Sequence, residues 1–313
     1  MRFAFSVQMF HPELDTAPHE GTFYLDVSHG MTVLDALIRI KNEQDGGLAF
    51  RYSCRSAICG SCAMTINGTE KLACRTAVRK EWGRHGEIRV GPLRNMPVLK
   101  DLAVDMRSFW GKVGEIAPWI QAESDQTVAP TARLAGEVQF HNVDACIMCG
   151  ACVAACTVHE VDKGFIGPAA LAKAYRFVAD PREGNASRHA RLTMLQEPRG
   201  IWDCTRCNFC VEVCPKDVQP MEAIIRLRRS AIEAGLTDTG GARHVVGFRD
   251  VVARFGRLNE ALVPLKVIGL SLKRFLHVAP LAVRMLVKGK VPNPFHPAIA
   301  GVGHIRSILT RKP

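Results

Sequence analysis

Apolar and polar residues alternate in two short stretches near the start of the chain, at residues 3–9 and 22–27. A period of two predicts half-buried strands, and the polar residues between them predict a hairpin turn. Thr32 then begins a predicted helix, with Asp35 three positions on as its capping-box partner. Gly46 and Gly47 end that helix in this interpretation, and its apolar face is formed by Val33, Leu34, Leu37, Ile38 and Ile40.

The pattern continues with shorter elements. Residues 63–66 and 87–90 are predicted strands, and Asn67-Gly68 is a strong hairpin turn. The later part of the chain changes to helical periodicity. Its predicted features are a connection at 92–100 with Pro92 and Pro97, helices at 101–111, 169–179 and 220–234, a polar surface excursion at 121–137, and short amphipathic helices within 256–313.

This organisation predicts an α+β protein with a small N-terminal α+β domain and a second, mainly helical domain. The predicted divisions are the N-terminal domain at 1–95, a connector at 96–138, the helical domain at 139–255 and a basic amphipathic tail at 256–313. Residues 1–15 lack the apolar region of a signal peptide, and the most apolar stretch is far shorter than the about 20 residues that a spanning helix needs. We therefore expect an intracellular chain whose contact with a membrane comes through partners.

Charge changes this picture in one region. The formal net charge is +11. If the twelve cysteines bind three clusters as thiolates, the net charge falls to about +5. The remaining excess gathers in residues 261–313, which hold nine Lys or Arg and no Asp or Glu.

Twelve cysteines lie in three tight groups, and a chain without a secretory signal is expected to use such groups for metal. The first group has the C-x4-C-x2-C spacing of plant-type [2Fe–2S] proteins, followed by a fourth cysteine beyond the Asn67-Gly68 turn. Zinc favours paired ligands across a hairpin and fits this loop poorly. The predicted [2Fe–2S] ligands are Cys54, Cys59, Cys62 and Cys74.

The other two groups are both C-x2-C-x2-C-x3-C runs, which is the pattern of two-cluster ferredoxins. Three cysteines of each run bind one cubane, and the fourth binds the other. One [4Fe–4S] cluster is therefore assigned to Cys146, Cys149, Cys152 and Cys214. The second is assigned to Cys156, Cys204, Cys207 and Cys210.

Other chemistry is weakly indicated. His159 could face a cluster or a quinone, and Arg55 and Arg206 could raise a reduction potential from within the cluster loops. Phosphate-binding glycine motifs and Ser/His/Asp sets are absent from the sequence, so we expect no catalytic residue in this chain.

These motifs together resemble the iron–sulfur subunit of succinate dehydrogenases and fumarate reductases. The resemblance covers residues 1–235 and includes the loop 54–62, the connector 97–102 and the run 210–216. It implies a β-grasp ferredoxin domain followed by a bacterial-ferredoxin-like helical domain. It also implies a non-catalytic subunit that carries electrons between an FAD-containing flavoprotein and a quinone or an anchor subunit.

Two departures from the family bear on the acceptor. Most members have an apolar residue at the position of Cys207 and carry a [3Fe–4S] cluster there, whereas Cys207 makes a cubane available. The aromatic quinone-pocket segment is replaced by Thr157-Val158-His159-Glu160. Residues 284–309 also resemble the C-terminus of the small iron–sulfur subunit of heterodisulfide reductases.

Together these features favour the family variant whose anchor is cysteine-rich and heterodisulfide-reductase-like. We expect a peripheral subunit on the cytoplasmic side of the membrane, held there by its partners, with no nucleic-acid partner. Two alternatives stay open: a thiol:fumarate or heterodisulfide reductase subunit, and a free-standing multi-cluster ferredoxin.

Overall fold

A computed structural model describes most of the chain, namely residues 2–122, 140–269, 271–290, 292–293, 295 and 297–310. The chain divides into two compact units, Met1–Leu227 and Arg228–Pro313. All twelve cysteines belong to the first unit. Nearly all of the predicted polar excursion at 121–137 lies outside the described residues.

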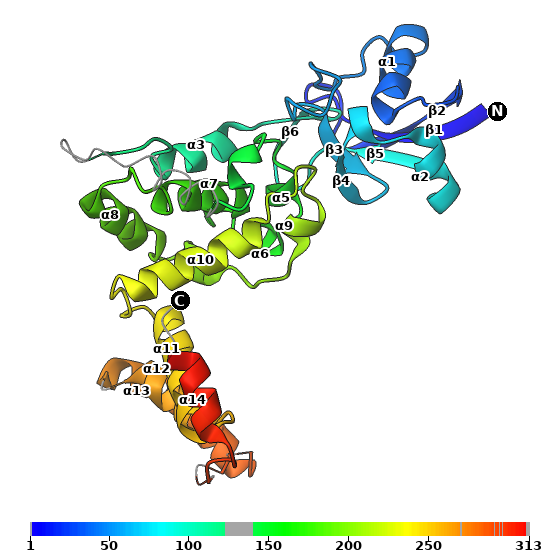
Figure 1. The fold of residues 1–313 in the computed structure, drawn as a ribbon. Helices are drawn as coiled ribbons and strands as arrows, with labels where there is room; N and C mark the ends of the chain where they lie inside the picture. Colours follow the sequence, from blue (N-terminus) through cyan, green and yellow to red (C-terminus); the bar gives the residue numbers. More distant parts are fainter. Residues whose placement is uncertain are drawn as a thin grey trace. The chain divides into compact units, whose positions relative to one another are not determined.

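The first unit begins with a mixed five-stranded sheet in the order β2-β1-β5-β3-β4 (Figure 1). Strands β1 and β5 are parallel, and every other neighbouring pair in the sheet is antiparallel. The strands are β1 Arg2–Met9, β2 His19–Asp26, β3 Ala63–Ile66, β4 Thr69–Leu72 and β5 Ile88–Gly91. This sheet confirms the predicted strands, each with bounds that differ by three residues or fewer.

Alternation along the strands explains why the sheet has one buried face. Phe3, Phe5 and Val7 on β1 are buried, while the residues between them stay partly exposed. Phe5 pairs with Phe23 on one side and with Ile88 on the other, so the central strand brings the domain core together.

Helix α1 (Val33–Glu43) packs on this core, and the predicted capping box is present in both directions. The Asp35 amide donates to Thr32 Oγ1 over 3.2 Å, and the Thr32 amide donates to the Asp35 carboxylate over 3.0 Å. The helix ends at Glu43, three residues before the predicted glycine stop. A second helix, α2 (Val78–His85), was not predicted from the sequence. It holds its place because Trp82 packs edge-on against Phe3, with ring centroids 4.8 Å apart.

The helix predicted at 101–111 is wrong at its start. Residues Val98–Lys100 and Ala103–Val104 form the short antiparallel strands β6 and β7, and helix α3 spans Arg107–Glu115. The cause is Asp101, which is buried with a positive φ of 46°. Its carboxylate accepts hydrogen bonds from the amides of Phe10 and Ala49, at 2.9 Å and 2.8 Å, and so fixes a turn where a helix would otherwise start.

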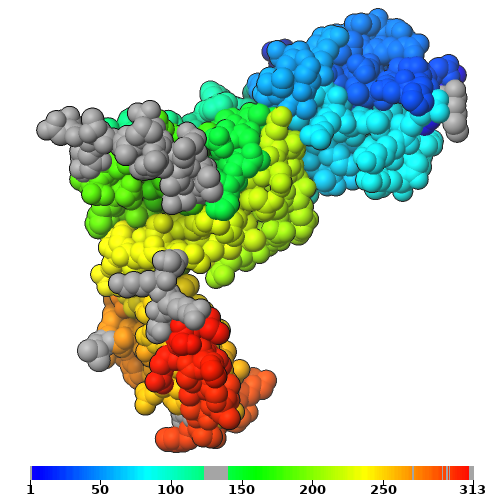
Figure 2. Space-filling view, in the orientation of Figure 1, coloured from blue at the N-terminus to red at the C-terminus, as the bar shows by residue number. Residues whose placement is uncertain are grey.

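Helices make up the rest of the first unit. Their bounds are η1 Ala73–Arg75, η2 Val143–Ala145, α5 Ala151–Ala154, α6 Thr157–Val161, α7 Pro168–Val178, α8 Asn185–Leu195, η3 Ile201–Asp203 and α9 Phe209–Glu212. Helix α10, Pro220–Glu233, begins in the first unit and ends in the second. The helices predicted at 169–179 and 220–234 correspond to α7 and α10. The sheet-bearing part and the helical part meet over a continuous surface (Figure 2).

The second unit contains the whole of the predicted basic tail, 256–313. Beyond the end of α10 its helices are α11 Gly240–Phe255, α12 Leu262–Ile268, α13 Leu272–Val287 and α14 Val302–Thr310. Gly256 ends α11 in the left-handed region, and Ile299 and Ile305 pack against it. In contrast, no residue of α13 is buried. No helix among the described residues has the length and apolar character required to cross a bilayer.

The two parts of the first unit are in close contact at Gly60. A methyl group added there would lie 2.8 Å from Cys149 Cβ and 3.0 Å from the Ile147 carbonyl oxygen. Real Cβ atoms do not approach so closely, so only glycine allows the loop of the first cysteine group to reach the second group.

This contact gives a prediction for protein stability. Gly60→Ala should lower the free energy of unfolding by ~1–2 kcal/mol for the left-handed backbone and by a further ~1–3 kcal/mol for overpacking. Anaerobic urea unfolding of the intact chain measures both effects.

Gly68→Ala is the matched control, because Gly68 has a φ of 76° against 75° for Gly60 but nothing within 4 Å of the added methyl group. Equal losses of stability in the two variants would show that the contact at Gly60 contributes nothing.

Candidate functional site

The loop from Cys54 to Cys62 turns its backbone N–H groups toward sulfur. Cys54 Sγ accepts from the amides of Ser56, Ile58 and Cys59 at 3.4, 3.3 and 3.2 Å. Residues with positive φ produce this shape, because alternating right- and left-handed residues form a concave row of donors. They are Arg55, Ala57 and Gly60.

The four cysteines of this group fall into two neighbouring pairs. The Cys54 amide donates to Cys59 Sγ over 3.4 Å, and the Ser61 hydroxyl lies 2.9 Å from the same sulfur. The hydrogen bond with Ser61 is the main reason that the pKa of Cys59 falls to about 6. Burial raises the pKa of Cys62 to about 12, and Cys74 is its hydrogen-bonded neighbour. Two pairs of sulfurs suit the two irons of a [2Fe–2S] cluster.

The second and third cysteine groups have the same backbone at matching positions. Met148 and Arg206 have φ values of 54° and 59°, and Gly150 and Asn208 have 82° and 72°. A one-turn helix follows each, α5 in the first run and α9 in the second. The two runs are therefore structural repeats, although apart from their cysteines they share only Val153 and Val211 in sequence.

The fourth cysteine of each run lies near the other run. Burial is the main reason that the pKa of Cys149 rises to about 11, and the nearby Cys214 raises it further. Burial also raises the pKa of Cys156, with further contributions from Cys207 and Cys204. In addition, Thr157 Oγ1 donates to Cys207 Sγ over 3.7 Å. Each run thus brings its first three cysteines close to the last cysteine of its partner.

The donor set fits iron–sulfur clusters. All twelve cysteines are free, and several sulfurs accept backbone N–H bonds, as cluster ligands require. No three His, Cys, Asp or Glu side chains in the described part of the chain converge as they would around one bare metal ion. Cluster ligands are arranged differently, because the cysteines of one set bind different iron atoms.

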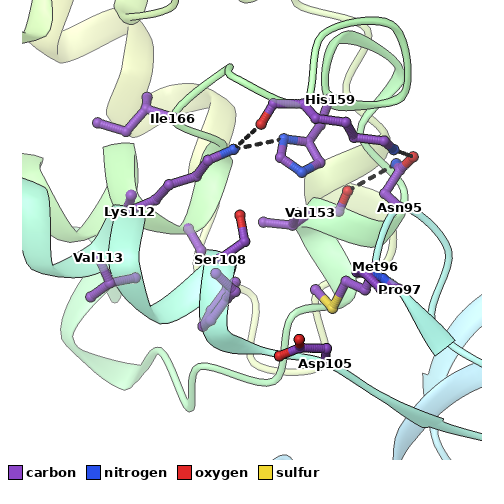
Figure 3. A pocket seen from close by; sticks show the side chains of 14 residues that line it. Asn95, Met96, Pro97, Asp105, Ser108, Lys112, Val113, Val153, His159 and Ile166 are labelled. Carbon is purple, nitrogen blue, oxygen red and sulfur yellow. Dashed lines mark hydrogen bonds between the residues drawn. The ribbon is translucent and has the colours of Figure 1, made fainter. Parts of the chain in front are cut away.

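A cavity of about 460 Å³ lies beside the segment that carries Cys156 (Figure 3). His159 lines it and donates its backbone amide to Cys156 Sγ over 3.5 Å. Lys112 Nζ lies 3.5 Å from His159 Nδ1 and donates to the Phe165 carbonyl over 2.7 Å. Burial lowers the pKa of His159 to about 4, assisted by the charge of Lys112, so the imidazole is neutral near pH 7.

The two arginines singled out in the sequence, Arg55 and Arg206, lie on the surface of the cluster loops. Arg55 is exposed, and its guanidinium stands 5.4 Å from the centre of the Tyr52 ring. Arg206 is exposed as well. Sequence reasoning missed the contacts made by Asn95, Lys112 and Asn142, since no spacing or periodicity marks them; their partners lie far away in the chain.

Family models match both halves of the first unit. A "2Fe-2S iron-sulfur cluster binding domain" matches residues 4–111, and a "4Fe-4S dicluster domain" matches residues 142–218. Each matched range contains the cysteines of the corresponding predicted clusters.

Curated relatives match most of this chain. It is 37% identical over 233 residues to the fumarate reductase iron–sulfur subunit of Mycobacterium tuberculosis (strain CDC 1551 / Oshkosh), covering 74% of this chain and 93% of that protein. It is 34% identical over 239 residues to the succinate dehydrogenase iron–sulfur subunit of Paracoccus denitrificans, covering 73% and 88%.

A solved structure supports the same fold. A chain of the Mycobacterium smegmatis Sdh1 complex in its apo form aligns with a TM-score of 0.66 at 24% identity, covering 74% of this chain and 96% of that one. The chain therefore belongs to the family of fumarate reductase and succinate dehydrogenase iron–sulfur subunits, in which it is an electron-transfer subunit with one [2Fe–2S] domain and one [4Fe–4S] dicluster domain.

Proposed function

We propose that this chain passes single electrons along three clusters, between an FAD-containing flavoprotein and an acceptor held by an anchor subunit. The observation that carries this proposal is the continuous series of cysteine contacts. The [2Fe–2S] loop touches Cys149 through Gly60. Helix α5 leads from the first three cysteines of that run to its last, Cys156, which lies near Cys204 and Cys207 of the third group.

The pairings of the sulfurs support the following proposed ligand sets. The [2Fe–2S] cluster takes the first group, Cys54, Cys59, Cys62 and Cys74. The first cubane takes Cys146, Cys149 and Cys152 with Cys214. The second takes Cys204, Cys207 and Cys210 with Cys156. When bound, these clusters supply the one-electron chemistry, and the protein supplies spacing, N–H donors and exclusion of water.

Exposed apolar side chains support contacts at both ends of the series. Ile58, in the [2Fe–2S] loop, is 64% exposed and suits a flavoprotein surface. Val161, just beyond Cys156, is 89% exposed, and Phe209 between Cys207 and Cys210 is also exposed. A partner at this second face would receive or supply electrons at the second cubane.

The acceptor is proposed to be an anchor of the cysteine-rich, heterodisulfide-reductase-like kind, with quinone reached only through it. Three features support this choice: the complete cysteine run with Cys207, the absence of aromatic residues at 157–160, and the tail at 284–309. The subunit would then sit on the cytoplasmic side of the membrane, held by its partners.

The same features keep a thiol:fumarate reductase as the second candidate. In that reaction two thiols are oxidised to a disulfide while fumarate gains two electrons and two protons to become succinate. The purified complex should be assayed for succinate oxidation with quinone and for fumarate reduction with thiol donors. The proposed electron path is wrong if neither succinate nor a thiol donor reduces the three clusters and neither quinone nor fumarate oxidises them.

Cys207 should be an iron ligand. Electron paramagnetic resonance on complex purified without air should therefore show two four-iron clusters, and Cys207→Ser should convert the second into a [3Fe–4S] cluster or abolish it. A stoichiometric [3Fe–4S] signal in wild-type protein never exposed to air would rule this assignment out.

The flavoprotein should bind over the [2Fe–2S] loop. Reversing the charge with Arg55→Glu should weaken the association roughly tenfold, as loss of an interface arginine often does. Arg84→Glu is the control, because Arg84 is exposed on α2 of the same domain. The proposal fails if both variants bind the flavoprotein as tightly as the wild type, measured by titration of the purified subunits.

The tail should dock the anchor through α13. Leu276 and Leu281 are 61% and 59% exposed and lie five positions apart, on different sides of the helix. Leu276 shares its side with Leu272, Val283 and Val287, whereas Leu281 lies nearer the cations of the helix. Such an exposed apolar side needs a covering partner in a stable complex.

We expect Leu276→Ser to reduce co-purification of the anchor, and Leu281→Ser to leave it nearly unchanged. Deleting residues 261–313 should release the anchor and leave all three clusters intact. Loss of clusters in the deletion, or full anchor yield in both the deletion and Leu276→Ser, would contradict the docking role.

A further inference from the structure

Two asparagines hold the chain next to the two cysteines that cross between the runs. Asn95 Nδ2 donates to the carbonyls of Val153, Ala154 and Cys156, at 3.2, 2.9 and 3.1 Å. Asn142 Nδ2 donates to the carbonyls of Lys216 and Asp217, at 2.7 and 3.1 Å. In each case an uncharged amide, with its two N–H donors, joins backbone carbonyls that lie far from it in the sequence.

The two sites share more than the hydrogen bonds. Asn95 and Asn142 have φ values of 64° and 67°, in the left-handed region that asparagine tolerates better than most residues. Neither lies inside a helix or strand: Asn95 is in the loop between β5 and β6, and Asn142 precedes η2. Their backbone conformation aims each amide away from its own segment and at another.

Each amide holds a turn that returns a backbone N–H to a crossing sulfur. In the segment held by Asn95, the His159 amide donates to Cys156 Sγ over 3.5 Å. In the segment held by Asn142, the Val218 amide donates to Cys214 Sγ over 3.3 Å. In each case one short segment contains both the carbonyls that accept from the asparagine and the backbone N–H that donates to the sulfur. By holding that segment, the asparagine side chain fixes the position of the sulfur.

Asn95 is itself fixed in place. Its Oδ1 accepts from Lys163 Nζ over 2.7 Å, and the neighbouring Met96 packs against Gly150 of the first run. Figure 3 shows the Asn95 amide directed at the backbone carbonyl of Val153. The loop that carries Asn95 comes from the sheet-bearing part, so this amide also joins that part to Cys156.

We infer that Asn95 and Asn142 are positioning residues, each placing one crossing cysteine and so each governing one cubane. Asn95 acts on the second cubane through Cys156, and Asn142 acts on the first through Cys214. This inference rests on the proposed assignment of Cys156 and Cys214 to different clusters.

Glycine variants separate the amide from the backbone strain, because glycine adopts the left-handed conformation without cost from a side chain. In the full complex, Asn95→Gly should alter the resonance signal and midpoint potential of the second cubane. Iron loss from that cluster to a chelator should be roughly tenfold faster, as expected when buried carbonyls lose their donors. Asn142→Gly should have the same effects on the first cubane only.

Asn67→Gly is the matched control. Asn67 also has a positive φ, of 48°, and its amide donates to the Glu87 carbonyl over 3.2 Å within the sheet. This variant should leave all three clusters unchanged. The [2Fe–2S] spectrum reports in every variant whether the fold survives.

The outcomes separate the inference from the assignment beneath it. Cys156→Ser and Cys214→Ser should affect different cubanes; if they affect the same one, the ligand assignment is wrong. With that assignment intact, the positioning role is overturned if Asn95→Gly and Asn142→Gly leave both cubanes unchanged or alter the same one. Loss of all three clusters together would overturn it too, since the amides would then support the fold as a whole.

Discussion

Twelve cysteine sulfurs have to gather in three small volumes, although thiolates repel one another and lose solvation when buried. Burial raises the pKa of Cys149 and Cys210, to about 11 and about 12, so these thiols favour the protonated form near neutral pH. Binding of iron must then release protons, which couples cluster assembly to pH. The fold reduces the cost by turning backbone N–H groups toward sulfur, and residues with positive φ make those turns.

This requirement extends beyond the cluster loops. Because short loops cannot bury sulfur alone, the two parts of the first unit pack closely around it. Gly60 lies against Cys149, and Asn95 reaches from the sheet-bearing part to the carbonyl of Cys156. Under the proposed ligand assignment, the same contacts also bring the clusters of the two parts closer together. Gly60 and Asn95 would then serve both packing and electron transfer.

The tail differs from the first unit because one of its helices leaves apolar side chains exposed. The alignment with the Mycobacterium tuberculosis relative covers 93% of that protein but 74% of this chain, so about a quarter of this chain has no counterpart there. Within the second unit, α11 packs with α12 and α14 around residues such as Val251 and Val263, whereas α13 leaves its apolar residues exposed. An apolar helix surface with cations and no anions has the chemistry of a docking element, which agrees with an additional partner contact.

The sequence by itself determined the features that depend on neighbouring residues. Alternation identified the strands, Thr32 and Asp35 identified the start of α1, and cysteine spacing identified three metal-binding groups, because each signal is contained in a few consecutive positions. The tertiary structure decided what depends on distant partners. Asp101 forms a turn instead of a helix because it binds the amides of Phe10 and Ala49. Asn95 likewise binds the carbonyls of Val153, Ala154 and Cys156 only because folding brings that segment within reach. The sequence cannot show this, because a side-chain amide can donate to any backbone carbonyl that comes close to it.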